Sequence, residues 1–279
     1  MKRRCTIGCV MAVAMVMFAF GLQPGPAAAD AVLMMATTTS TDNTGLLEYL
    51  APHFTQETGI ELRWTSTGTG KALALGRNCD VDVLLVHAPD AEIAFVEAGH
   101  GIHRRPIMYN DFVIIGPADD PAGVKGVGVP AAMAAIAEKQ SMFVSRGDDS
   151  GTHQKELELW PLSGRAIPER EAWYIQAGQG MLATINMAAE RRGYTMTDRG
   201  TFIKYAHDHG GRPPLVILVE GDAPLLNPYA VITVNPQKCP SVKADLADRF
   251  GQWLTGAKGQ SLIAEFKLMG QPLFFPDAR

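Results

Sequence analysis

Three short segments of this sequence are rich in hydroxyl and amide side chains, and each lies between an apolar stretch and a stretch with helical spacing. They cover residues 37–44, 66–70 and 146–152. A helix start offers unpaired backbone N–H groups and the positive end of the helix dipole, and Ser and Thr hydroxyls add neutral donors. Helix capping alone also selects Ser, Thr and Asp. Three such segments together favour a site for a small oxyanion.

The third segment contains Arg146, which is followed by Asp148, Asp149, Ser150 and Thr152. A guanidinium can donate two parallel hydrogen bonds to an oxyanion, and the helix start behind it supplies backbone donors aimed at the same point. Arg146 would then be the only full positive charge in the site. Asp148 or Asp149 could instead hold Arg146 in a structural ion pair. The sequence leaves both interpretations open.

The sequence lacks the common motifs of enzymes and metal sites. Residues 65–72 superficially resemble a phosphate-binding loop, but Thr65 replaces its first glycine and Ala72 stands where Ser or Thr would bind magnesium. Ser150 lacks the glycine two residues earlier that a nucleophile elbow requires. The histidines, His87 among them, show no zinc-protease spacing. We therefore expect no enzyme, no cofactor and no metal cation.

A repeated order of strand and helix positions the first two polar segments. This order predicts a parallel sheet with helices on both faces, and it places binding groups at the carboxyl ends of the strands. The predicted strands are residues 32–35, 60–64 and 81–86, and the helices that follow them are residues 46–54, a helix from residue 71, and residues 91–98.

The rest of the chain indicates a second lobe. Apolar runs at residues 107–115 and 229–234 are typical of strands that pass between two lobes. Between them lies further α/β sequence, with a strand at 142–144 and helices at 152–160 and 180–191. Residues 242–266 predict one or two amphipathic helices that return to the first lobe.

This organisation predicts an α/β protein with two lobes, a hinge and a central ligand cleft. Two crossings between lobes suit closure around a ligand. The expected boundaries are residues 30–112 plus 226–279 for lobe I and residues 113–225 for lobe II.

The N-terminus predicts export. Lys2, Arg3 and Arg4 precede an apolar run at residues 7–22, and small residues follow at 27–29, so we expect residues 1–29 to be a secretory signal peptide. No later apolar stretch is long enough to span a membrane. We expect a periplasmic protein.

The exported chain is acidic. Removing residues 1–29 takes the formal net charge from −4 to −7, because three basic and no acidic residues are lost. Nucleic acid and anionic membrane surfaces are therefore poor partners. Cys79 and Cys239 are the cysteines that remain, and they form either a disulfide in the oxidising periplasm or two isolated buried thiols.

Five segments in order resemble the tungstate-binding proteins of TupA-type ABC importers. They are residues 36–40 (ATTTS), 68–70 (GTG), 82–87 (DVLLVH), 108–112 (MYNDF) and 145–152 (SRGDDSGT). The resemblance covers essentially the whole exported chain. It implies a two-lobe type II periplasmic binding protein fold, similar to that of molybdate, sulfate and phosphate binders, with the anion buried at the hinge.

The resemblance also implies the ligand and its donors. The ligand would be the tungstate oxyanion, delivered by a monomer to an ABC transporter permease in the inner membrane. The paired cysteines are not part of this pattern. The implied oxyanion-binding residues are Thr37, Thr38, Ser40, Ser66, Thr67, Arg146, Ser150 and Thr152.

Three alternatives stay open from the sequence. Molybdate has the same charge and shape as tungstate and nearly the same size. Phosphate carries a proton near neutral pH and would favour an inward carboxylate, from Asp42, Asp148 or Asp149, whereas a carboxylate repels a fully deprotonated oxyanion. An enzyme or sensor on the same fold would need a base and nucleophile pair that the sequence does not show.

Overall fold

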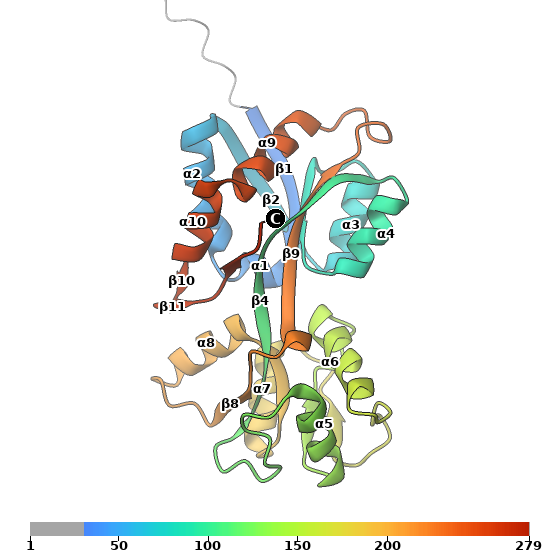
Figure 1. Cartoon of the computed structure of the whole chain (residues 1–279), viewed down its shortest axis with the longest axis vertical. Coiled ribbons are helices and arrows are strands. Elements are labelled where there is room, and N and C mark those ends of the chain that lie inside the picture. The colour runs from blue at the N-terminus through green and yellow to red at the C-terminus, as the bar shows by residue number, and fades with distance from the viewer. Residues whose placement is uncertain (1–30, 279) are drawn as a thin grey trace, which may run out of the picture. The chain divides into compact units, whose positions relative to one another are not determined.

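An eight-stranded mixed sheet runs through the computed structural model, which describes residues 31–278 (Figure 1). The strand order is β12-β4-β9-β3-β1-β2, and β7 and β8 also pair with β4. The strands are β1 (Ala31–Thr38), β2 (Ile60–Thr67), β3 (Val83–Val86), β4 (Gly101–Pro117), β7 (Thr195–Asp198), β8 (Leu215–Val219), β9 (Leu226–Val234) and β12 (Phe275–Pro276).

The expectation of a parallel sheet is correct only for part of it. Strand β1 pairs in parallel with β2 and β3, as strands joined by crossover helices do. Strand β9 pairs antiparallel with both β3 and β4. It returns from the second lobe without a crossover helix, so it enters the sheet from the opposite end.

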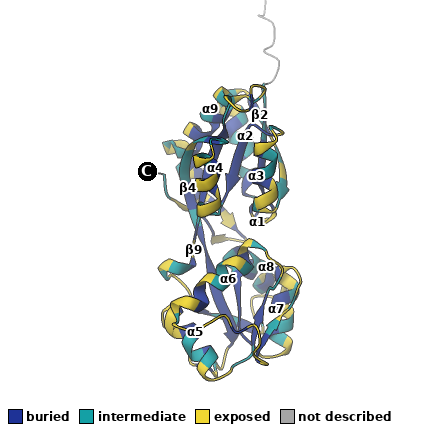
Figure 2. Ribbon diagram, turned by 90° about the vertical axis from the view of Figure 1, so that its right-hand side faces the viewer, coloured by how far each residue is buried: buried dark blue, intermediate teal, exposed yellow. Residues whose placement is uncertain are grey.

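Side chains alternate between the two faces of the strands, and both faces are buried. Val83 and Leu85 belong to one apolar cluster, while Leu84 and Val86 belong to another. Burial on both faces explains why β3 has no polar residue. It also explains why the apolar run predicts a strand here. Figure 2 shows buried strands enclosed by helices with exposed outer faces.

Helices cover both faces of the sheet in the first lobe (Figure 1). Helix α2 begins at Leu46, and its apolar face joins the cluster that also contains residues of α9 and α10. Helices α3 and α4 lie against the other face. Their bounds are α2 (Leu46–Thr58), α3 (Thr69–Arg77), α4 (Pro89–Glu97), α9 (Ala244–Thr255) and α10 (Ala257–Glu265).

The second lobe has its own two apolar clusters. On β4, Phe112 and Ile114 belong to one cluster, and Val113 and Ile115 belong to the other. The remaining elements here are α5 (Val129–Glu138), β5 (Phe143–Ser145), α6 (Gly151–Leu162), β6 (Tyr174–Gln176), α7 (Met181–Glu190), α8 (Arg199–Asp208) and the 3₁₀ turn η1 (Ala223–Leu225). Strands β5 and β6 pair in parallel, and near the C-terminus β10 (Lys267–Leu268) pairs with β11 (Gln271–Pro272).

Strands β4 and β9 run through both halves and pair with each other at the crossing (Figure 1). The predicted two-lobe α/β fold is therefore confirmed, while the residue boundaries of the lobes stay a prediction. Asp111, on β4, receives two hydrogen bonds from Arg199 at 2.5 and 2.6 Å. This partly buried ion pair joins the crossing strand to the start of α8.

Several local expectations were incomplete. Strands β1 and β2 extend through Thr38 and Thr67, so part of each predicted polar loop is strand. The sequence patterns do not predict β6, β7, β8, α5 or α8. The predicted signal peptide lies outside the described residues. Within residues 31–278, no helix is both long and apolar enough to cross a membrane.

Cys79 and Cys239 form a disulfide, which resolves the open choice between a bond and two thiols. It joins the end of α3 to the segment after β9, across a sequence separation of 160 residues. The bond lies at the α3–α4 side of the first lobe, where Cys239 belongs to the apolar cluster.

Candidate functional site

The first polar segment forms a tight hydrogen-bonded corner after β1. Thr38 caps the short helix α1 (Thr39–Asp42), because its Oγ1 accepts from the Thr41 backbone N–H at 3.3 Å. The same oxygen lies 3.1 Å from the Ser40 Oγ. Thr37 is fully buried, and its hydroxyl donates to the Leu85 carbonyl at 2.8 Å. The proton of the Thr37 hydroxyl is therefore already used inside the sheet.

The second segment is tied to the first through Asp42. The Ser66 hydroxyl donates to Asp42 Oδ2 at 2.7 Å, and the Trp64 indole N–H donates to Oδ1 at 2.6 Å. This carboxylate is thus held by two donors, and Ser66 has only acceptor capacity left at its hydroxyl. Thr67 lies half-buried at the end of β2, one residue before the N-cap Gly68 of α3.

The third segment combines an ion pair with a helix cap. Arg146 Nε donates to Asp148 Oδ2 at 2.8 Å. The other oxygen of Asp148 accepts from the Ser150 backbone N–H, and the Ser150 hydroxyl caps α6. The structural ion pair that the sequence left open is therefore present. It uses only Nε, and both Nη groups of Arg146 have no hydrogen-bond partner among residues 31–278.

Gly147 explains how the chain turns at this point. Its φ is 61°, in the left-handed region that favours glycine, and a Cβ added there would lie 2.7 Å from the Cβ of Gln176. Any other residue would both strain the turn and displace β6. The turn directs the chain into α6, where Thr152 is buried in the first turn.

His153 follows Thr152 and was not singled out from the sequence. Its Nδ1 accepts the Asp149 backbone N–H at 3.1 Å. The proton of the neutral ring must then lie on Nε2. That Nε2 atom is buried and has no partner within residues 31–278. His153 therefore adds an unused N–H donor to the third segment.

His87, directly after β3, joins the first segment to the crossing strand β9. Its Nε2 lies 3.1 Å from Thr38 Oγ1 and 3.2 Å from Ser40 Oγ. Its Nδ1 lies 3.1 Å from Asn227 Oδ1, and its ring packs on Tyr229 with centroids 4.7 Å apart. His87 ends one of the segments that resemble TupA proteins, but no local pattern predicts this role, because every partner is at least 47 residues away.

The tertiary fold also brings the first and third segments together. A Cβ built on Gly151, the first residue of α6, would lie 4.0 Å from His87 Cε1. Lys204 of α8 donates to the Asn43 carbonyl at the end of the first segment. The Thr38, Ser40 and His87 group therefore faces the N-terminus of α6 across the junction of the two lobes.

Electrostatics favours an anion that needs donors and no acceptor. All three carboxylates of the polar segments already have partners: Asp42 and Asp148 as described, and Asp149 Oδ1 with Gln154 Nε2 at 3.2 Å. Burial lowers the pKa of His87, opposed by its bond to Asn227 and the charge of Asp198. Burial raises the pKa of Glu156, which accepts from Ser145, Trp160 and Tyr174 beneath the third segment.

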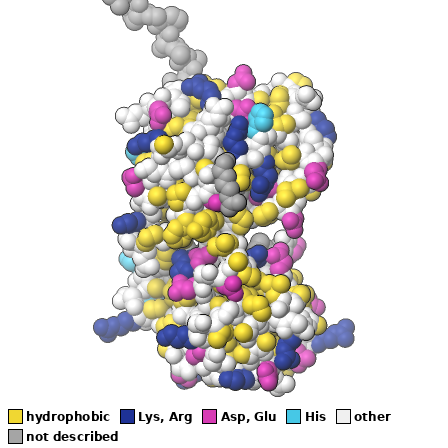
Figure 3. All heavy atoms as spheres, viewed as in Figure 1, with side chains coloured by type: hydrophobic (Ala, Val, Ile, Leu, Met, Phe, Trp, Pro, Cys, Tyr) yellow, Lys and Arg dark blue, Asp and Glu magenta, His cyan; other side chains and the backbone are white. Residues whose placement is uncertain are grey.

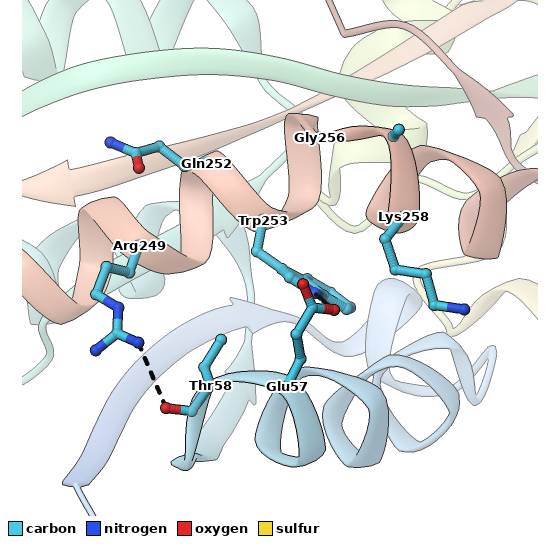
Figure 4. A pocket seen from close by; sticks show the side chains of 8 residues that line it. Glu57, Thr58, Arg249, Gln252, Trp253, Gly256 and Lys258 are labelled. Atoms are coloured by element: carbon cyan, nitrogen blue, oxygen red, sulfur yellow. Dashed lines mark hydrogen bonds between the residues drawn. The ribbon is translucent and has the colours of Figure 1, made fainter.

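Other hollows on the surface offer weaker sites. The hollow in Figure 4, about 340 Å³, lies between the end of α2 and the α9–α10 junction. Its Trp253 and Arg249 already donate to Glu57 and to the Thr58 carbonyl. No group of three potential metal-ligating side chains occurs within residues 31–278. On the face in Figure 3, acidic and basic side chains are interspersed and form no basic patch.

Two lobes joined by two strands, with donor-rich segments meeting at their junction, define the class of solute-binding proteins with a periplasmic binding fold. A family described as "PBP superfamily domain" matches residues 25–258.

Relatives of known name agree with this class. The tungstate-binding protein TupA of Campylobacter jejuni is 47% identical over 240 residues, covering 86% of this chain and 89% of the relative. The structure of the tungstate-binding protein TupA of Desulfovibrio alaskensis G20 is 64% identical with a TM-score of 0.88, covering 89% and 100% of the two chains. A tungstate ABC transporter structure from Geobacter sulfurreducens is 46% identical with a TM-score of 0.73, covering 84% and 98%. The chain belongs to the TupA family of the PBP superfamily.

Proposed function

We propose that this chain is a periplasmic binding protein that captures tungstate and delivers it to an ABC importer in the inner membrane. The observation that carries the proposal is the meeting of Thr38 and Ser40 with the N-terminus of α6 at the lobe junction. Similarity to TupA proteins over most of the chain supports tungstate as the ligand.

Binding would proceed by exchange of hydration for protein donors. Burying a dianion is tolerable only when nearly all of its oxygen lone pairs meet donors. The donors we assign are the Thr38 and Ser40 hydroxyls, the Arg146 Nη groups, and the free N–H groups that begin α3 and α6. Closure of the two lobes around the anion would then present the shape that a permease recognises.

The eight residues implied by the sequence keep different roles in this proposal. Thr37 and Ser66 already donate their hydroxyl protons to Leu85 and Asp42, so they would contribute backbone N–H groups or shape the pocket. Ser150 would act through its N-cap position. Thr67 and Thr152 lie at helix starts and would contribute through backbone or hydroxyl.

The engaged carboxylates support a fully deprotonated oxyanion over phosphate. Asp42 and Asp148 each accept a protein hydrogen bond at both carboxylate oxygens, and Asp149 accepts one at Oδ1, so these carboxylates are oriented by protein donors and not by the proton of a hydrogen phosphate. Molybdate has the same charge and shape and is the nearest competitor. No covalent step is required, so we propose a binding protein and no enzyme; that it acts as a monomer stays an expectation.

Calorimetric titration of the purified protein with tungstate, molybdate, sulfate and phosphate tests the proposal. We expect tungstate to bind most tightly, with molybdate nearest to it and phosphate weakest. Binding of phosphate alone would contradict the assignment of the ligand, and absence of heat with all four oxyanions would contradict the anion-binding function.

A further inference from the structure

We propose that His87 is the proton-accepting residue of the anion site: enclosing a doubly charged oxyanion converts its neutral ring to an imidazolium, which turns the Thr38 and Ser40 hydroxyls toward the anion. This inference rests on the proposed function and adds a second positive charge to a site in which Arg146 was the only one expected.

The proton on the neutral ring is assigned by the hydrogen bonds around Asn227. The Asn227 amide donates through Nδ2 to Asn110 Oδ1 at 2.7 Å. Its Oδ1 therefore faces His87 Nδ1, and a carbonyl oxygen can only accept. His87 Nδ1 must carry the proton, which leaves a lone pair on Nε2. Both asparagines are buried and are cross-strand partners on β4 and β9, so this arrangement is fixed by the sheet.

The lone pair on Nε2 opposes anion binding through the two hydroxyls. Thr38 and Ser40 lie within 3.2 Å of Nε2, so one of them donates its proton to the neutral ring. That hydroxyl proton is then not available for a hydrogen bond to the anion. An imidazolium would instead donate its Nε2 proton toward these oxygens, so neither hydroxyl would have to donate to His87. Thr38 Oγ1 also lies 2.7 Å from Thr41 Oγ1, and Thr41 can be the donor of that contact, which leaves the Thr38 proton for the anion.

The balance of charge in the site also favours protonation of His87 when the anion is bound. Arg146 is paired with Asp148, and Arg199 is paired with Asp111 and Glu220. Lys204 is held at the Asn43 carbonyl on the exposed side of the first segment. Among the described residues Lys204 has no carboxylate partner, but the Asn43 carbonyl that it contacts belongs to an exposed residue, so solvent screens its charge. These groups would therefore compensate the two charges of an enclosed dianion only in part. Protonation of His87 supplies a positive charge within hydrogen-bonding distance of Thr38 and Ser40.

The other groups around His87 set its resting state. Tyr229, on β9, stacks on the ring and stays neutral, and Asp198, the N-cap of α8, favours a positive charge. The N-terminus of α6 at Gly151 disfavours it. Glu92 of α4 is committed to Arg104 and to the Ala88 backbone N–H. Because burial lowers the pKa of His87, the ring is neutral near pH 7 without ligand.

His153 supplies a matched comparison in the same site. Its Nδ1 accepts a backbone N–H that cannot reverse, so adding a proton there would break the bond to Asp149. In the neutral ring His153 is therefore a donor through Nε2. His87 has an acceptor at Nδ1 and reversible hydroxyls at Nε2, and it alone of the two can gain a proton without losing a partner.

The test is calorimetric titration with tungstate at pH 7.5 in buffers of different ionisation enthalpy, which measures proton uptake on binding. We expect uptake approaching one proton in the parent and in His153→Gln, and none in His87→Gln. The tungstate affinity of the parent should fall by up to about tenfold per pH unit above about pH 6.5, because one proton is bound with the ligand. In His87→Gln this slope should disappear.

A second measurement uses the parent alone and does not depend on variants that fold. The His87 Cε1–H resonance, followed by NMR against pH, should titrate at higher pH with tungstate than without it. Tungstate binding without proton uptake, or uptake that survives His87→Gln, would overturn the inference while leaving the proposed function intact. Absence of tungstate binding by the parent would instead overturn the proposed function.

Discussion

Replacing Arg146 with glutamine tests whether this arginine holds the ligand. The guanidinium uses Nε for Asp148 and keeps both Nη groups for another acceptor. Glutamine removes the charge and the two parallel donors. A charge-assisted contact to a buried anion contributes about 2–4 kcal/mol, so the dissociation constant for tungstate should rise about 30- to 1,000-fold. Arg146→Lys should cost less, because the charge survives.

Loss of the ion pair between Arg146 and Asp148 should have only a small effect on the stability of the unliganded protein. The side chains of Arg146 and Asp148 are 23% and 22% exposed, and such a partly solvated pair contributes about 1 kcal/mol or less. For a protein of this size, that corresponds to a decrease in melting temperature of about 2–4 °C. Arg146→Gln should therefore reduce affinity strongly and stability weakly.

Arg63→Gln is the matched control. Arg63 also pairs with a carboxylate two residues away, Glu61, but that pair is exposed on β2. The control changes the same residue type and the same net charge, and tungstate affinity should stay within about twofold. Calorimetry and thermal melting on the same preparations measure both quantities. A large loss of stability in Arg146→Gln with affinity close to the parent would refute a ligand role for Arg146.

Further predictions concern the whole fold. Tungstate at a thousand times its dissociation constant should stabilise the native state by about 4 kcal/mol. The melting temperature should then rise by about 8–16 °C. An unchanged melting temperature would contradict specific binding. Replacing Cys79 and Cys239 by serine removes a link across 160 residues and should destabilise the fold by up to about 5 kcal/mol, with tungstate affinity within a few-fold of the parent. Since burial raises the pKa of Glu156 above its unfolded value, its stabilising contribution is largest below about pH 4.5 and falls as pH rises. Thermal melts at pH 5 and pH 8 should therefore show the parent losing stability relative to Glu156→Gln as pH rises, and an equal difference at both values would contradict this.

The sequence by itself predicts the class of site. Each polar segment lies at a junction of strand and helix, and such junctions depend on hydrophobic period and capping residues within about ten positions. The same local information predicted the parallel order of β1, β2 and β3, and the two crossings that became β4 and β9. Resemblance to TupA proteins added the ligand, and the comparisons confirmed that family.

The tertiary structure decided which donors remain for a ligand. Arg146 and Asp148 are two residues apart, yet only the fold shows that Nε alone is used. Ser66 gives its proton to Asp42, 24 residues away, and His87 receives its partners from segments 47 to 140 residues distant. A hydrogen bond needs two atoms about 3 Å apart, and the distance between such remote segments is set by how the strands pair. No local pattern contains that information, so the mixed sheet, the disulfide and the position of His87 appear only when the chain is folded.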